Sequence, residues 1–166
     1  MPKFLSIANK LLSLRGNIRI TDENDNLVFE ARGEFALFSA TWRIFQNGTQ
    51  VASIRRKIFA ITPTYTIRGG LGEFTIKRKI FAFTRQMYVL GGPYDGARIA
   101  GNIWDLRFSV EGHKGVIAKA AGKILTLRDR HNVELQTQDA NDALFVVIAM
   151  VTLQIDRQHE KNKRDE

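Results

Sequence analysis

Residues 51–62 read VASIRRKIFAIT, and residues 73–84 read EFTIKRKIFAFT. The two segments align without a gap at an offset of 22 residues, and residues 27–38 (LVFEARGEFALF) form a weaker third copy. Three more segments with a similar alternation of apolar and polar residues begin at Ile7, Ile99 and Val116. Internal similarity of this kind indicates a fold that repeats one supersecondary unit.

Each unit consists of a first strand, a short turn and a second strand. Alternating apolar and polar residues, many of them β-branched or aromatic, predict the strands. The second strands are expected to begin at Asn17, Thr41, Thr64, Gln86, Trp104 and Asn132. Turn-forming residues lie at Asp22–Asn26, Asn47-Gly48, Gly69-Gly70, Gly91–Pro93 and Glu111–His113. Six units predict about twelve strands, and an antiparallel sheet of that size tends to close because closure removes exposed edges.

The C-terminal part follows a different pattern. Capping side chains at Asp139–Asp142 precede the run ALFVVIAMVTL at residues 143–153. This run is apolar on all sides, which predicts a helix that is buried all round or lies in a membrane. With about 11–13 residues it is too short to span a bilayer. A buried strand is the competing interpretation, but the length and the acidic cap favour a helix.

These patterns predict a mainly β fold in a single domain. We expect a closed antiparallel β-barrel of about twelve strands whose interior surrounds the C-terminal helix. The domain is expected to cover residues 1–157, with the helix at about 141–157 and a polar tail at 158–166.

Several motifs resemble one known family. The motifs are the hairpin series, the basic-Ile-Phe repeats, the acid-capped apolar helix and the short segments KLLSLR (10–15), TDEN (21–24) and PTY (63–65). They resemble the LURP-one-related family, in the tubby C-terminal-like superfamily together with phospholipid scramblases. The resemblance covers roughly residues 6–157. It implies a twelve-stranded antiparallel barrel around a central C-terminal helix. Tubby relatives bind phosphoinositides through basic side chains on the barrel surface, which implies a similar role here without assigning ligand positions.

The positive charge of the chain comes from one segment. The formal net charge is +8, and residues 43–90 contain nine basic residues and one acid, Glu73, whereas the flanking parts are balanced. Concentrated positive charge attracts phosphate-rich partners, either lipid headgroups or nucleic acid. A solvated basic face that only aids solubility is the competing interpretation. Two triplets form the candidate anionic-ligand site: Arg55, Arg56, Lys57, Lys77, Arg78 and Lys79.

Strand alternation divides these six residues into two groups. The middle residues, Arg56 and Arg78, share the phase of the neighbouring isoleucines. They must lie near a barrel end or pair with acids if that phase faces inward, because an unpaired buried charge is too costly. We predict that the other four point to solvent and form one patch: Arg55, Lys57, Lys77 and Lys79.

The sequence offers little catalytic or metal-binding chemistry. The chain has no cysteine, which excludes disulfides, thiolate metal sites, cysteine nucleophiles and iron–sulfur clusters. Asp22–Asn26 resembles the start of a calcium loop, but Leu27 replaces the required Gly and Gly33 replaces the required Glu, so a metal-free turn is predicted. His113 and His131 lack ligand spacing and are expected to be loop residues. We expect no catalytic residue, no metal and no cofactor.

Two functions therefore stay open. The first is non-enzymatic binding of anionic phospholipid, phosphoinositide or a membrane surface through the basic face, in a cytoplasmic protein that is peripheral to the membrane. The second is nucleic-acid binding by the same patch, because Phe59, Phe81 and Phe83 flank the triplets and aromatic residues stack on bases. Trp42 and Trp104 are expected to pack in the core or the barrel wall rather than to anchor a membrane.

Overall fold

The structure is a computed structural model that describes residues 1–8, 16–34, 41–82, 84–101, 107–120 and 130–164. This part of the chain contains twelve strands and one helix. The elements are β1 (Phe4–Ala8), β2 (Asn17–Thr21), β3 (Leu27–Glu34), β4 (Thr41–Gln46), β5 (Thr49–Arg56), β6 (Thr64–Gly69), β7 (Gly72–Arg78), β8 (Gln86–Leu90), β9 (Arg98–Ala100), β10 (Ser109–Gly112), β11 (Gly115–Ala120), β12 (Arg130–Leu135) and α1 (Ala140–Arg164).

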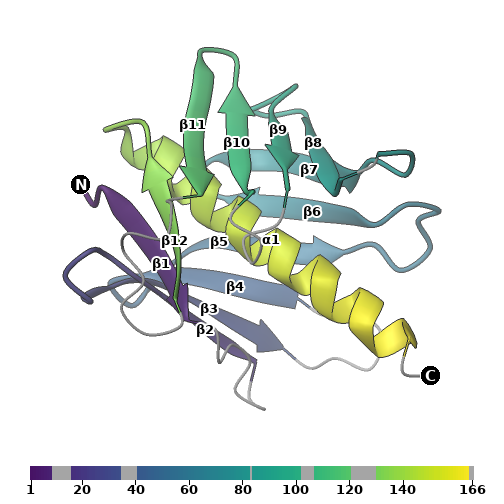
Figure 1. The fold of residues 1–166 in the computed structure, drawn as a ribbon. Coiled ribbons are helices and arrows are strands. Elements are labelled where there is room, and N and C mark those ends of the chain that lie inside the picture. Colours follow the sequence, from purple (N-terminus) through teal and green to yellow (C-terminus); the bar gives the residue numbers. More distant parts are fainter. Residues whose placement is uncertain (9–15, 35–40, 83, 102–106, 121–129, 165–166) are drawn as a thin grey trace.

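The strands form one closed antiparallel barrel in which each strand pairs with its neighbours in the sequence (Figure 1). β1 closes the barrel by pairing with both β2 and β12. The predicted barrel and its strand number are thus confirmed. In the repeated segments, β5 and β7 are the first strands of successive units and flank β6. Equivalent positions of the two copies consequently lie two strands apart on the same wall.

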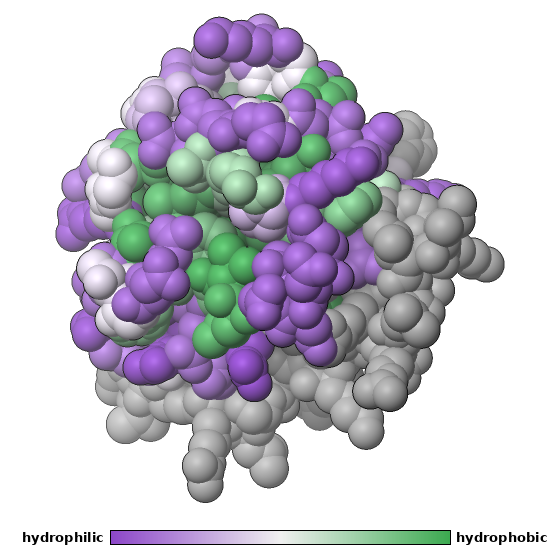
Figure 2. Space-filling view, turned by 90° about the vertical axis from the view of Figure 1, so that its left-hand side faces the viewer, coloured by the Kyte–Doolittle hydropathy of each residue, from purple (hydrophilic) through white to green (hydrophobic). Residues whose placement is uncertain are grey.

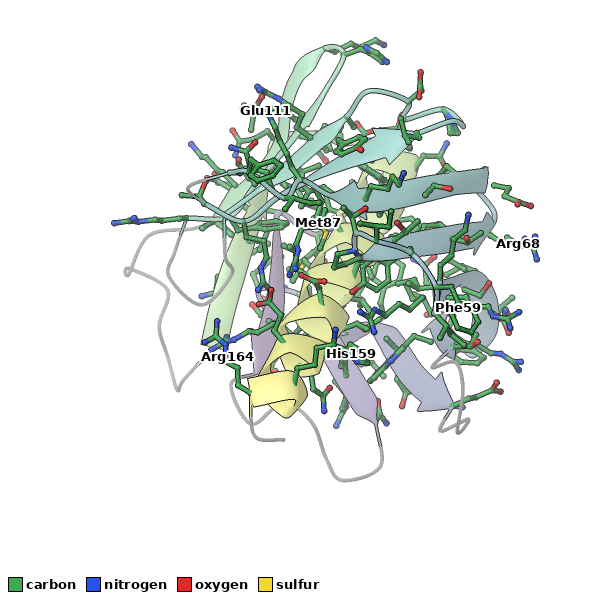
Figure 3. The ribbon with its side chains drawn as sticks, turned by 90° about the vertical axis from the view of Figure 1, so that its right-hand side faces the viewer. Phe59, Arg68, Met87, Glu111, His159 and Arg164 are labelled. Carbon is green, nitrogen blue, oxygen red and sulfur yellow. The ribbon has the colours of Figure 1, made fainter. Side chains whose placement is uncertain are left out.

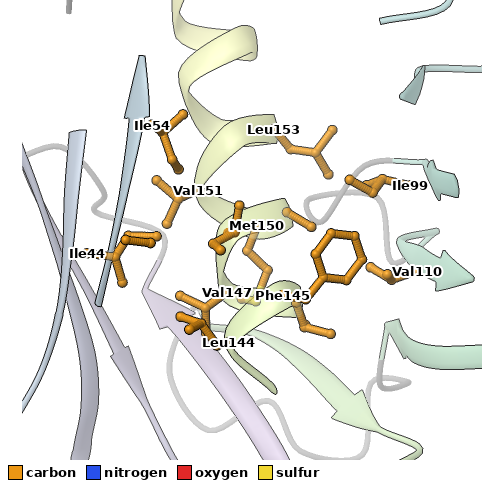
Figure 4. Close-up of a cluster of buried hydrophobic side chains, with 14 of the residues drawn as sticks. Ile44, Ile54, Ile99, Val110, Leu144, Phe145, Val147, Met150, Val151 and Leu153 are labelled. Atoms are coloured by element: carbon orange, nitrogen blue, oxygen red, sulfur yellow. The ribbon is translucent and has the colours of Figure 1, made fainter. Parts of the chain in front are cut away.

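Helix α1 occupies the interior of the barrel. Every residue from 143 to 156 is buried. Ile44 and Ile54 contribute to the cluster on one side of the helix, and Ile99 and Val110 lie on the other (Figure 4). An apolar surface on all sides is stable here because strands surround the helix on all sides. This confirms the predicted buried helix and excludes the competing strand.

The start of α1 is capped as the sequence predicts. Asp139 precedes the helix, and its Oδ1 accepts the Asn141 N–H at 2.8 Å. The Tyr94 hydroxyl donates to Asp142 Oδ1 at 2.7 Å, and Thr137 donates to the other oxygen at 2.9 Å. These contacts satisfy one free N–H group of the first turn and both oxygens of the Asp142 carboxylate, and they fix the helix where it enters the barrel.

The end of α1 differs from the prediction. The helix continues to Arg164, whereas we expected it to end near residue 157 and to be followed by a polar tail. Glu160 pairs with Arg78 and Arg85 on the barrel. Ion pairs with the wall therefore stabilise the last turns, where apolar burial has ceased. The local sequence shows only polar and charged residues there and does not reveal their partners.

The hairpin turns follow the predicted turn chemistry. Asp22 Oδ1 accepts the N–H groups of Asn24 and Asn26 at 2.9 and 2.8 Å, which closes the β2–β3 turn. His113 is exposed in the β10–β11 turn, as expected. Trp42 is buried against Gly33, where an added Cβ would lie 2.8 Å from the indole ring, so the predicted packing role of Trp42 is confirmed. His131 was expected in a loop but lies in β12, opposite Ile7 of β1. Trp104, Phe83 and the side chain of His131 are outside the described part of the structure.

Candidate functional site

The basic triplets lie where two strands run into loops. β5 ends at Arg56 and β7 ends at Arg78. The Lys57 N–H donates to the Thr64 carbonyl at 2.8 Å, and Thr64 lies opposite Lys77 in the β6–β7 pairing. Lys57 and Lys77 thus belong to one row across three strands, with backbones roughly 10 Å apart at the usual strand spacing.

The outer residues of both triplets face away from the helix, as predicted. Ile54 and Ile76, in the opposite phase, are buried against the interior. Within the described part of the chain, no ion pair involves Lys57, Lys77 or Lys79. Three of the four outer residues are exposed and Lys77 is half-buried. We call these four residues the basic face: Arg55, Lys57, Lys77 and Lys79.

A groove adjoins the basic face on its β5 side. It has a volume of about 720 Å³. None of its described lining residues is acidic, and five are basic: Arg43, Arg55, Arg56, Lys57 and Arg68. Phe59 lies beside this group at the rim of the barrel, on the same side as Arg68 (Figure 3). We call this feature the basic groove.

Two arginines of the basic groove form ion pairs with carboxylates that lie outside its lining. Arg43 pairs with Glu34 at 3.1 Å, and Arg68 makes two hydrogen bonds to Glu73 at 2.9 and 3.2 Å. The hydrogen bonds from Arg68 lower the pKa of the Glu73 carboxyl. Both pairs are exposed, so each contributes little to stability, and a stronger anion can compete for the arginine.

Arg78 points into the barrel and joins a network at its end. Its Nη1 lies 3.1 Å from Asp156 Oδ2 and also contacts Glu160. Arg85 Nη1 lies 3.4 Å from the same Asp156 oxygen, and the Tyr65 hydroxyl donates to Asp156 Oδ1 at 2.8 Å. Asp156 is only 1% exposed. We call these residues the Asp156 network; it confirms that an inward-phase arginine lies near a barrel end and pairs with acids.

Burial and the adjacent Asp156 carboxylate raise the pKa of Tyr65. Both effects favour the neutral phenol, since a phenolate would place a second negative charge beside Asp156. Tyr65 therefore acts as a hydrogen-bond donor that fixes the carboxylate. The Asp156 network links β6, β7 and the β7–β8 loop to the second half of α1.

Arg56 is the equivalent of Arg78 in the β5 copy but has different surroundings. It lies opposite Tyr65 in the β5–β6 pairing and lines the basic groove. Its Nε is buried and has no hydrogen-bond partner among the described residues. The structure thus brings five candidate residues together on the outer face and in the groove, and it directs Arg78 to the helix.

Sequence reasoning missed several residues of this region. Arg43 and Arg68 contribute to the groove because β4 and β6 flank β5, and Arg43 lies opposite Ser53. Strand phase alone could have placed both on the outer surface next to Arg55. Asp156, Glu160 and Arg85 could not be connected from the sequence, because their pairing depends on where the helix leaves the barrel.

A match to a protein-family model shows which family the chain belongs to. The model of the LURP-one-related family matches residues 4–154. The chain belongs to the LURP-one-related family. The match begins at the first residue of β1 and ends within α1, before Asp156. In this LURP-one-related protein, the acids of the Asp156 network therefore lie beyond the matched residues.

The fold is shared with a solved plant structure. An X-ray structure of a protein from Arabidopsis thaliana superimposes with a TM-score of 0.61 and 18% sequence identity, covering 92% of this chain and 93% of that chain. At this identity the likeness shows the fold alone. No curated protein matches the chain. Among the described residues, no helix combines the length and the apolar character needed to cross a bilayer.

Proposed function

We propose that this protein is a non-enzymatic module that binds anionic phospholipid at a membrane surface through the basic face and the basic groove. The observation that carries the proposal is the grouping of four outward-facing cations, of which the three lysines have no ion-pair partner in the described part of the chain. A Lys or Arg near an anionic membrane contributes about 1 kcal/mol. Four together give a strong attraction that salt weakens.

The filled interior supports recognition at the outer surface. Small barrels that hold a ligand usually hold it inside. Here the side chains of residues 143–156 occupy that space. The basic groove, at about 720 Å³, lies within the size range of ordinary ligand pockets and would accept a phosphorylated headgroup.

The charge of the face also indicates where binding occurs. Anionic lipids give the cytoplasmic leaflet a negative surface potential. We therefore infer that the protein is cytoplasmic and associates peripherally with that leaflet.

Nucleic-acid binding by the same residues is the competing function. One observation favours it: Tyr88 is exposed and lies opposite Lys77 on the neighbouring strand, where an aromatic ring can stack on a base. The experiment below includes polynucleotide for this reason.

The test compares two variants that lose the same charge. One variant replaces the basic face by glutamine: Arg55→Gln, Lys57→Gln, Lys77→Gln and Lys79→Gln. The control replaces four cations elsewhere on the surface: Lys3→Gln, Arg98→Gln, Lys114→Gln and Lys119→Gln. Each protein is sedimented with phosphatidylcholine vesicles that contain or lack phosphatidylserine, over a range of salt concentrations. Binding of the same proteins to polynucleotide is measured at the same salt concentrations.

We expect the parent and the control to sediment with anionic vesicles at low salt, and the basic-face variant to stay in solution. Equal losses in both variants would show that only net charge matters. The lipid proposal would be overturned if the parent protein did not bind anionic vesicles. It would also be overturned if the parent bound polynucleotide in preference to vesicles at the same salt concentration.

A further inference from the structure

The two loops that follow the basic triplets carry solvent-exposed apolar side chains. In the β5–β6 loop, Phe59 is 98% exposed and Ile61 is 99% exposed. In the β7–β8 loop, Phe81 is 93% exposed. Ile58 of the β5–β6 loop and Ile80 of the β7–β8 loop are half-exposed and occupy equivalent positions of the two copies. Scattered apolar residues at a surface are normal, but five large ones in two adjacent loops mark an interaction surface. We call them the apolar loop tips.

The two loops are neighbours in space. The Arg78 N–H donates to the Pro63 carbonyl at 3.0 Å, which connects the end of β7 to the base of the β5–β6 loop. Both loops project from the side of the barrel where α1 ends, at the right of Figure 1. The opposite side of the barrel carries hairpin turns, and there hydrophobic residues gather in the middle of the face with hydrophilic residues around them (Figure 2). The apolar loop tips thus belong to one side of the molecule.

A lysine lies at the base of each loop, next to its apolar residues. Lys57 directly precedes Ile58, and Lys79 directly precedes Ile80. An apolar apex above a layer of positive charge matches the profile of an anionic bilayer, where negative headgroups cover the acyl region. We propose that the two loops insert side by side into an anionic lipid bilayer, with the apolar loop tips in the acyl boundary and the basic face against the headgroups. This inference rests on the proposed function. It adds how deeply the bound protein enters the bilayer and which side of the barrel faces the lipid.

The composition of the loops favours a bilayer over other partners. A second copy of this chain would bring two cationic surfaces together, since residues 43–90 hold nine basic residues and one acid. Three of the five apolar loop tips are isoleucines, which have no π-face for stacking on a base. A bilayer accepts aliphatic and aromatic side chains alike and places anions around them.

The absence of native cysteine makes a site-specific test direct. Three single-cysteine variants, Phe59→Cys, Phe81→Cys and Leu27→Cys, are labelled with a nitrobenzoxadiazole fluorophore. Leu27 is the control, because it is half-exposed at the start of β3, next to the β2–β3 turn. Emission is recorded with phosphatidylcholine–phosphatidylserine vesicles that carry or lack acyl-chain spin labels. Sedimentation of the same samples measures binding independently.

We expect the emission of the two loop probes to shift to shorter wavelength on binding and to be quenched by the acyl-chain spin labels. The emission of the Leu27 probe should stay as it is in water. Bound protein whose loop probes both remain water-like would overturn the insertion and leave the proposed function intact. Protein that does not sediment with the vesicles would overturn both. A blue shift caused by polynucleotide, or by self-association without vesicles, would replace the bilayer with that partner.

A label-free variant tests the same inference. Phe59→Ser with Phe81→Ser removes two exposed rings and should leave folding unchanged, as should the matched control Leu27→Ser with Val116→Ser. The loop variant should partition about tenfold more weakly into anionic vesicles while keeping its salt sensitivity, since the cations remain. The control should bind as the parent does. Equal binding of the loop variant and the parent would contradict insertion.

Discussion

The two copies of the repeated segment share a basic triplet and both place its middle arginine near Tyr65, yet the two arginines differ in their partners. Arg78 of the β7 copy pairs with Asp156 and Glu160 of α1. Arg56 of the β5 copy lines the basic groove and keeps a buried Nε without a partner among the described residues. Both lie in the inward phase at the end of a strand, so the strands do not explain the difference. The position of the helix does, because its last turns pass Arg78 and Arg85.

This difference separates a structural role from a binding role. The β7 copy uses its middle arginine to hold the helix, whereas the β5 copy leaves the equivalent group beside a groove of other cations. The outer residues of both copies have the same orientation and form one basic face. A repeat in sequence therefore predicts the strand phase, and the surroundings of each copy decide what the side chain does.

A charge in the middle of the buried helix should prevent folding, and with it the difference between Arg56 and Arg78. Val147 is fully buried in the middle of α1. We expect Val147→Asp to prevent folding, because an unpaired buried charge costs several kcal/mol, comparable to the stability of a domain. Circular dichroism and thermal unfolding measure this. The control Lys163→Asp lies on an exposed part of the same helix and should fold. A soluble Val147→Asp protein with an unchanged Tm would contradict the central position of α1.

The equivalent substitutions Arg78→Met and Arg56→Met compare the two copies directly. Arg78→Met leaves the buried Asp156 with fewer partners and should lower the free energy of unfolding by about 2–3 kcal/mol. Arg56→Met breaks no ion pair among the described residues and keeps the packing of the side-chain stem, so a change within about 1 kcal/mol is expected. Urea denaturation of both variants tests the difference. Equal destabilisation would mean that the two arginines have the same role.

High pH should weaken the Asp156 network through Tyr65. The pKa of Tyr65 is raised in the folded protein, so its contribution is fully present below the ordinary tyrosine pKa of about 10 and is lost as the pH rises above it. The free energy of unfolding should fall by at most about 1.4 kcal/mol per pH unit from this group. Tyr65→Phe should show a smaller fall, and the exposed control Tyr88→Phe should follow the parent. An identical slope in Tyr65→Phe would exclude Tyr65 as the sensitive group.

The smallest change in stability is expected when calcium is added, at the β2–β3 turn (22–26). Asp22 already accepts hydrogen bonds from Asn24 and Asn26, so its carboxylate is engaged within its own turn. Calcium titration should leave the Tm unchanged, because a ligand that binds only the folded state must stabilise it. A calcium-dependent rise in Tm, absent in Asp22→Asn, would show that the turn is a metal site.

The repeat and the apolar run were sufficient to predict most of the fold. Alternation gives the inward and outward phases of β5 and β7, and a run without a polar side requires a surrounding wall. The end of α1 was wrong because Glu160 gains its stability from Arg78 and Arg85, which are distant in sequence. The groove was missed for the same reason, since Arg43 and Arg68 meet Arg55 only through strand pairing. Local patterns predict orientation, whereas partners depend on the closed barrel.

The most direct test of the account is backbone hydrogen exchange with and without anionic vesicles, since it compares both sides of the barrel in one unlabelled sample. Exchange should slow in peptides covering the β5–β6 loop (57–63) and the start of the β7–β8 loop (79–82). It should stay unchanged at the β2–β3 turn (22–26) and the β4–β5 turn (47–48). Protection at those turns instead of the loops, or no protection in vesicle-bound protein, would contradict docking through the basic face and its apolar loop tips.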